Sequence, residues 1–323
     1  MEAIPFGRLH WGFLPALIGL SALHYVFAAR CVQAASRPRL PMRETLMTQF
    51  SAAAANRLTP AGLGAAAVNV RFLNCRGVPA GEAVATVAAV QVVGAIADLL
   101  LFVVVVLAGH WTGGGGGDLL SAMGGHATDI ARRLPLPLQA AVALIVTAAL
   151  VWWYRSSRRS GSASSALAGI ADLVRRPADL LSLLLFSAGT TLVMGTAFTI
   201  SVLAVPGATG PAEAQTLLIA YLLGSAAATA VPTPSGLGST EAALVAVLAS
   251  SDVAAGHAVQ AVLLFRVITY WAPVPVGLLT TGPLRRRSVP TAGPATVPTA
   301  VPATVPTTLP TAGPTSLSAP GTT

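Results

Sequence analysis

The sequence predicts an all-α, polytopic integral membrane protein that contains an inverted internal repeat. Three observations lead to this fold class: apolar residues far outnumber charged ones, several apolar segments are long enough to span a membrane, and Pro and Gly interrupt two further apolar regions in the same way. Of the 323 residues, 54% are hydrophobic and 9% are charged, and the mean hydropathy is +0.72. Because a soluble domain carries about 25% charged residues, this composition excludes the soluble globular class.

Five apolar segments reach the roughly 20 residues that a spanning helix needs. Residues 11–30 are expected to be a retained helix and not a cleaved signal, because no basic region precedes them and no clear cleavage site follows. The other four spans are residues 82–109, 136–154, 180–205 and 257–281.

Two more regions, residues 44–76 and 213–252, are apolar but divided by Pro and Gly. Helices broken at membrane depth are tolerated only where protein or a water-filled cavity surrounds them. Each region is therefore expected to form a broken or re-entrant helix pair, or alternatively two ordinary helices joined by a tight loop. The total is about 7–9 helices.

The basic residues predict the orientation of the chain. All 19 are Arg, and three clusters lie in residues 30–43, 155–176 and 285–287, whereas residues 206–212 contain none. Since cytoplasmic loops collect positive charge, we expect a plasma-membrane protein with its N-terminus outside and its C-terminal tail cytoplasmic. Only Arg132 and Arg133 fall on the opposite side. The net charge of +8 then reflects topology and anionic lipid, and no nucleic-acid partner is expected.

The domain organisation follows from a change in composition near the C-terminus. Residues 1–284 are predicted to form one transmembrane domain, and residues 285–323 a disordered tail rich in Pro and Thr. The two cysteines and five histidines show no metal-ligand spacing. We therefore predict neither a metal site nor a cofactor.

The internal repeat is carried by the motif P-x-G-L-G, which occurs at residues 60–64 and again at residues 234–238. The two copies cover about residues 44–109 and 213–281, and one begins after an Arg cluster and the other after the Arg-free loop. They are therefore expected to lie in opposite orientations, as in many secondary transporters. The predicted structural turns are Pro60, Gly62, Gly64, Pro234, Gly236 and Gly238.

The half-helix that follows each motif would begin inside the membrane, where its free N–H groups attract anions such as phosphate. The candidate substrate-binding residues are the charged groups in or beside the apolar stretches: Arg71, Glu241, Arg266, Asp98 and Arg57. Two alternatives remain open: Glu241 and Arg266 could form an ion pair that only fixes the fold, and Arg71 could extend to the inner surface. Hydrogen bonds between helices are expected for Asn56, Asn69, Gln91 and Tyr221.

These residues resemble a known family, the lysylphosphatidylglycerol synthase transmembrane domain family, also described as flippase-like. The resemblance covers about residues 10–285 and rests on the run from Pro232 to Glu241, followed by Arg266. The first copy is similar to the N-terminal signature of the family, with Pro60-x-Gly-x-Gly, Arg71-x-x-x-x-Arg76-Gly77-Val78 and Asp98. The sequence departs from the family pattern at Ser235, where Gly is expected, and at Gln91, where a charged residue often stands.

The resemblance implies a lipid translocase that acts on an anionic or aminoacylated phospholipid or a lipid-linked intermediate, with the anionic headgroup as ligand. It does not imply lysylphosphatidylglycerol synthesis, because no soluble synthase domain is apparent, so a transporter is expected in preference to an enzyme. One alternative is a non-catalytic scaffold that partners a lipid- or glycan-pathway enzyme. Another is an intramembrane transferase with a lipid-linked donor and Glu241 or Asp98 as base.

Overall fold

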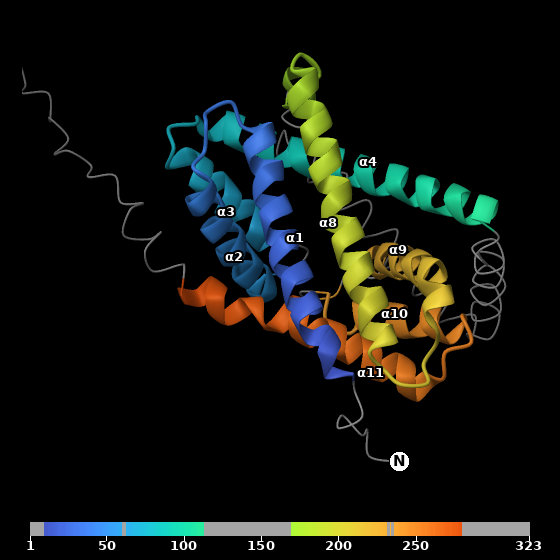
Figure 1. Ribbon diagram of the computed structural model, residues 1–323. Helices are drawn as coiled ribbons and strands as arrows, with labels where there is room; N and C mark the ends of the chain where they lie inside the picture. The colour runs from blue at the N-terminus through green and yellow to red at the C-terminus, as the bar shows by residue number, and fades with distance from the viewer. Residues whose placement is uncertain (1–9, 60–62, 113–168, 231–232, 234–235, 280–323) are drawn as a thin grey trace, which may run out of the picture. The chain divides into compact units, whose positions relative to one another are not determined.

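The computed structural model describes residues 10–59, 63–112, 169–230, 233 and 236–279 (Figure 1). Every regular element in these ranges is helical, which confirms the predicted all-α class. The chain divides into Met1–Ser288 and Val289–Thr323, and all described residues belong to the first unit. The predicted span 136–154, the tail 285–323 and three predicted turn residues lie outside the described residues: Pro60, Gly62 and Pro234.

Four helical stretches among the described residues are long and apolar enough to cross a membrane. Large apolar side chains point outward from them, as Leu99 does with 63% of its surface exposed, which suits helices surrounded by lipid. Four of the five predicted spans are thus found as membrane-length helices. The stretches are Trp11–Ala35, which contains α1 (Leu14–Ala35); Ala80–Ala108 in α4 (Ala80–Thr112); α8 (Pro177–Leu203); and Ala255–Leu279, which begins with α11 (Ala255–Arg266).

Helices α1 and α8 pack side by side in opposite directions (Figure 1). At one end the backbone N–H of His10 donates to the carbonyl of Ala204 at 3.0 Å. At the other end the guanidinium of Arg176 donates to the carbonyl of Ala35 at 3.3 Å. We call the end that holds Ala35 and Arg176 the arginine end, and the end that holds His10 and Ala204 the opposite end.

The first interrupted region forms a helical hairpin. The chain enters and leaves it at the arginine end, so the hairpin opens there and its tip points away from that end. It consists of α2 (Met42–Leu58) and α3 (Leu63–Asn74), and an ion pair between Glu44 and Arg76 joins the start of α2 to the residues after α3. The helices have 17 and 12 residues, so they are about 25 Å and 18 Å long at 1.5 Å per residue. As described, both are shorter than the roughly 30 Å hydrocarbon core, a length that fits a broken or re-entrant pair.

The second interrupted region forms the matching hairpin, which opens at the opposite end. It consists of α9 (Ala214–Ala230) and α10 (Ser239–Ala249). Gly207, before α9, faces the ring of His257 in the first turn of α11, and Val253, after α10, is buried in the same cluster as Val205. Since α4 begins at the arginine end and α11 at the opposite end, the two copies run in inverted directions, as the motif and charge pattern predict.

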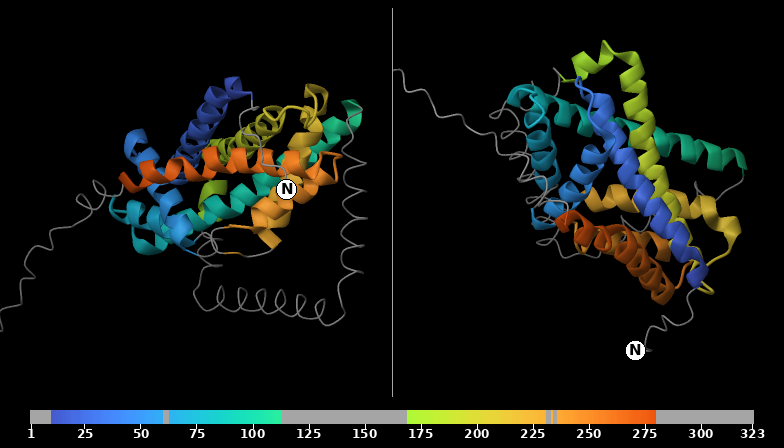
Figure 2. Two further views of the ribbon diagram at one scale, coloured as in Figure 1. Left: turned by 90° about the horizontal axis from the view of Figure 1, so that it is seen from below. Right: turned by 60° about the vertical axis from the view of Figure 1, so that its left-hand side comes forward.

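Each hairpin packs on the long helix of the other copy. In one contact, Ile219 and Leu222 of α9 are buried with Val105 of α4. In the other, Gly277 lies directly against the carbonyl of Phe50 in α2 and leaves no room for a side chain. The last helical stretch therefore runs from α10 of its own copy to α2 of the other, as the two views of Figure 2 show. This reciprocal packing brings the tips of the two hairpins together.

Candidate functional site

The tips of the two hairpins line one cavity of about 340 Å³. Ala65, in the first turn of α3, and Thr240, in the first turn of α10, both contribute to its wall. Backbone N–H groups in the first turn of a helix have no partner within that helix, and they carry the positive end of the helix dipole. Two half-helices, one from each copy of the repeat, thus contribute their N-terminal turns to the same space.

Arg57 brings a positive charge to this cavity from the end of α2. Its Nη2 donates to the carbonyl of Tyr270 at 2.6 Å, and its Nη1 donates to the carbonyl of Ala53. Within the described residues no carboxylate lies within ion-pair distance of Arg57. Its Nε is buried and makes no hydrogen bond there. Arg57 is therefore held in place by backbone carbonyls while its charge is left uncompensated.

Arg266, at the end of α11, is the second cation in the cavity wall and is 8% exposed. Its Nε lies 2.5 Å from Oε1 of Glu241, and its Nη2 lies 3.5 Å from the carbonyl of Gly236. Oε2 of Glu241 accepts the backbone N–H of Gly238 at 2.7 Å. The expected Glu241–Arg266 ion pair is therefore present, and it ties α10 and the preceding turn to α11.

Tyr270 joins the two arginines. The guanidinium carbon of Arg57 lies 4.1 Å from the centroid of its ring, and that of Arg266 lies 4.0 Å away, so both are in cation–π contact. Tyr270 belongs to a π-helical turn, Val267–Trp271, that directly follows Arg266. Pro273 follows this turn, and its ring would crowd the carbonyl four residues earlier in a regular α-helix. Such π turns occur often at functional sites.

The other polar groups of the wall are a histidine, hydroxyl groups and amides. His24 of α1 lines the cavity, with its Nδ1 3.5 Å from the carbonyl of Thr190. Gln49 donates to Oδ1 of Asn69 at 2.9 Å, which confirms a hydrogen bond between helices for Asn69. No Asp or Glu is among the described lining residues. The remaining polar lining residues are Tyr25, Asn56, Tyr221, Ser225, Thr240 and Thr269.

Three predicted site residues do not line this cavity: Glu241, which is paired with the lining residue Arg266, and Arg71 and Asp98, which lie elsewhere. Arg71 is exposed near the end of α3, towards the arginine end. Asp98 lies on an exposed part of α4, and its Oδ1 accepts the hydroxyl of Thr191 in α8. The structure thus brings Arg57, Arg266 and Glu241 together and places Arg71 and Asp98 elsewhere.

The glycines of the two motifs take different roles. Gly236 and Gly238 have φ angles of +69° and +86°, a left-handed backbone conformation that favours glycine and shapes the turn before α10. Gly64 instead lies in the first turn of α3, where a Cβ would collide with the carbonyl of Ala55 and the hydroxyl of Thr59. The first motif therefore uses glycine for close approach of two helices, and the second uses it for a turn.

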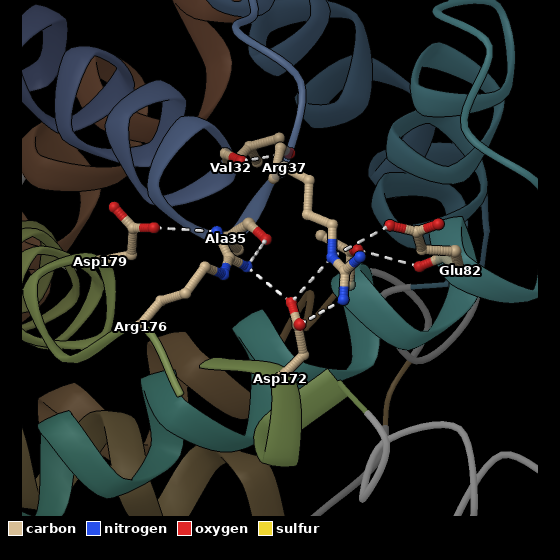
Figure 3. A network of polar contacts seen from close by, with 9 residues as sticks. Val32, Ala35, Arg37, Glu82, Asp172, Arg176 and Asp179 are labelled. Atoms are coloured by element: carbon tan, nitrogen blue, oxygen red, sulfur yellow. Dashed lines mark hydrogen bonds and ion pairs between the residues drawn. The ribbon is translucent and has the colours of Figure 1, made fainter. Parts of the chain in front are cut away.

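A second polar cluster lies at the arginine end, beside a cavity of about 530 Å³ (Figure 3). Arg37 bridges Asp172 and Glu82, and its Nε lies 3.6 Å from Oε1 of Glu82. Arg176 lies 2.8 Å from both Asp172 and Asp179. The hydrogen bond from Arg37 holds the pKa of Asp172 below its usual range, with a smaller contribution from Arg176. This network fastens the start of α4 to α1 and α8.

The sequence did not single out Tyr270 or His24, although both line the cavity. A signal for Tyr270 exists, because it lies four residues after Arg266 on a helical stretch, and residues at that spacing share a face. His24 lies in an apolar segment with no neighbouring polar pattern, and only the packing of α1 against the hairpins places it at the cavity. The described residues contain no group of three or more His, Cys, Asp and Glu side chains that could hold a metal ion.

Comparison with known proteins supports the resemblance seen in the sequence. The family model of the lysylphosphatidylglycerol synthase TM region matches residues 6–277, which includes every described helix up to the last stretch. A search among curated proteins gives no match. The match covers most of the chain and includes both hairpins and both cavity arginines, so the chain belongs to the lysylphosphatidylglycerol synthase transmembrane family.

Proposed function

We propose that this integral membrane protein of lipid metabolism is a lipid translocase. It would move an anionic phospholipid, aminoacylated or not, or a lipid-linked intermediate, between the leaflets. The headgroup would occupy the cavity between the hairpin tips, and the acyl chains would stay in the surrounding lipid. One observation carries this proposal. Each copy of the repeat contributes one half-helix N-terminal turn and one arginine to the wall of the same cavity.

The chemistry of the cavity favours a phosphate. Helix N-termini and arginines both bind phosphate oxygens, the first through backbone N–H groups and the second through a planar fork of donors. The volume of about 340 Å³ lies at the lower end of the roughly 300–1,000 Å³ of ligand pockets. It suits a headgroup and not a whole lipid.

The position of the cavity favours movement between leaflets. The hairpins enter from opposite ends of the α1–α8 pair, and their tips meet between those ends. Inverted repeats that meet near the bilayer midplane commonly form the binding sites of secondary transporters. A headgroup held there could be reached from either side through a shift of one hairpin against the other.

We further propose that the arginine end faces the cytoplasm, which places the N-terminus outside and the tail inside. Of the described arginines, those before or at the start of α2, after α3 and before α8 gather at this end: Arg37, Arg39, Arg43, Arg76, Arg175 and Arg176. Such a one-sided excess is what the positive-inside rule associates with a cytoplasmic face.

The test is headgroup movement of a fluorescent anionic phospholipid in liposomes that contain the purified protein. Arg57→Ala should slow this movement by at least about tenfold, because a charged hydrogen bond to phosphate contributes about 1.5–3 kcal/mol. Arg57 is the best residue to remove, since its loss leaves no carboxylate unpaired. Arg57→Lys keeps the charge and should retain part of the rate.

Arg30→Ala is the matched control, because Arg30 is exposed on α1, away from the cavity, where its guanidinium donates a hydrogen bond to Gln33. It should move lipid at the wild-type rate. Equal rates for the Arg57→Ala and wild-type proteins would contradict the assigned site. No lipid movement by the wild-type protein would contradict translocation and favour a scaffold that recruits a lipid or glycan enzyme.

A further inference from the structure

The charge arrangement of the cavity narrows the class of substrate, and this step rests on the translocase function proposed above. We infer that the cavity selects headgroups with one phosphodiester and an uncharged, hydroxylated substituent. It would discriminate against headgroups that carry an added cationic group, such as a lysyl ester. The cavity wall carries a surplus of positive charge, and the carboxylate and aromatic rings beside it are already engaged.

The negative charge of Glu241, beside the cavity, is already offset by Arg266. Oε1 of Glu241 binds Arg266 at 2.5 Å, and Oε2 binds the backbone N–H of Gly238 at 2.7 Å. An incoming ammonium group would meet a carboxylate whose charge Arg266 already neutralises, with the uncompensated charge of Arg57 in the same cavity wall. Asp98, the other candidate acid, lies on the exposed part of α4 and does not line the cavity.

The aromatic rings of the cavity are also engaged. The Tyr270 ring has guanidinium groups within 4.1 Å and 4.0 Å of its centroid, so a third cation there would meet two like charges. Tyr25 is stacked on Phe50 with 4.4 Å between ring centroids. Tyr221 packs against Phe198 and Phe265 at 5.6 Å and 5.8 Å. No open aromatic cage for an ammonium group is formed by these rings.

The neutral groups of the wall suit hydroxyl groups instead. Hydroxyl and amide side chains from both hairpins and from the turn after α11 can accept or donate a hydrogen bond to a glycerol or sugar hydroxyl. Arg57, Arg266 and Glu241 together leave one formal positive charge, which matches the single negative charge of a phosphodiester. The neutral polar residues that could serve are Gln49, Asn56, Ser225, Thr240 and Thr269.

Binding of two lipids that differ only in the lysyl group tests this inference. The purified full-length protein in detergent would be titrated with dihexanoyl phosphatidylglycerol and with its lysyl ester, and Kd measured by thermophoresis. We expect phosphatidylglycerol to bind at least about tenfold more tightly, because a cation that loses water without a partner is strongly disfavoured. Glycerol 3-phosphate serves as a soluble phosphate ligand without acyl chains, and it should bind more weakly than phosphatidylglycerol.

A new carboxylate in the cavity wall should change the preference for phosphatidylglycerol over its lysyl ester. Thr240→Glu places an acid in the first turn of α10, where the helix dipole favours it, so the variant is expected to fold. The lysyl ester should then bind at least as tightly as phosphatidylglycerol. Thr240→Gln, of equal size without the charge, should keep the wild-type preference.

The outcomes separate this inference from the translocase function. Equal or tighter binding of the lysyl ester by the wild-type protein would overturn the inference, even if both lipids move across liposomes. Preferential binding of phosphatidylglycerol without any movement would support the inference and overturn translocation. Binding of neither lipid would overturn both, and glycerol 3-phosphate binding as tightly as the lipid would show a soluble phosphate ligand and overturn the lipid assignment.

Discussion

At the scale of single residues, the Glu241–Arg266 pair combines a structural contact with a position at the cavity. It is a nearly buried ion pair that ties α10 to α11, and Arg266 also lines the cavity. Removing one partner of such a pair leaves an uncompensated charge, whereas removing both does not. This difference makes the structural part of its role measurable apart from any lipid binding.

We predict that Glu241→Ala and Arg266→Ala each lower the free energy of unfolding by about 3–5 kcal/mol. The double variant Glu241→Ala/Arg266→Ala should lose clearly less than the sum of the two, because neither charge is then left alone. Unfolding of the three variants in detergent, followed by circular dichroism against temperature, measures the coupling. Strict additivity would show that the two side chains do not interact.

The sequence predicted part of this site and missed part, for a physical reason. Arg57, Glu241 and Arg266 could be named because charged groups in apolar segments need a partner or a cavity. Arg71 satisfies the same criterion, but it lies at the far end of α3 and not at its tip. Sequence composition gives the presence of a charge in an apolar region, and only the length and packing of the half-helix give its depth.

At the scale of elements, the Pro- and Gly-containing interruptions predicted the hairpins well. The four described spans and both hairpins follow from apolar length and from the two motifs. The π-helical turn at Val267–Trp271 was not predicted, because it depends on how Pro273 perturbs the preceding turn within a packed bundle. That turn nevertheless places Tyr270 between the cavity arginines.

The contact between the two copies at Gly277 gives a prediction at this scale. Gly277→Ala should lower the free energy of unfolding by about 1–3 kcal/mol, because a Cβ would collide with the carbonyl of Phe50 and push α2 away. Gly19→Ala in α1 is the matched control, since nothing lies within 4 Å of a Cβ there. That change should stabilise the helix by up to about 1 kcal/mol. Equal effects of both substitutions on thermal unfolding would contradict the close packing of α2.

At the scale of the whole molecule, the inverted repeat and the charge distribution together predict the orientation of the chain in the membrane. The α2–α3 hairpin opens at the arginine end, and the α9–α10 hairpin opens at the other. If the arginine end is cytoplasmic, then the residues between α3 and α4 face the cytoplasm and those between α10 and α11 face outward. The chain carries a natural probe of this arrangement, because Cys75 is exposed directly after α3 and Cys31 is buried.

We predict that a membrane-impermeant maleimide labels Cys75 only after cells expressing the protein are permeabilised, and that Cys75→Ser abolishes the labelling. In that background, Ala255→Cys places a thiol at the exposed start of α11, and it should label in intact cells. The reversed labelling pattern would still support the inverted repeat, but it would contradict the proposed orientation. Labelling of both positions from the same side would contradict the inverted repeat itself, because α4 and α11 would then begin at the same face of the membrane.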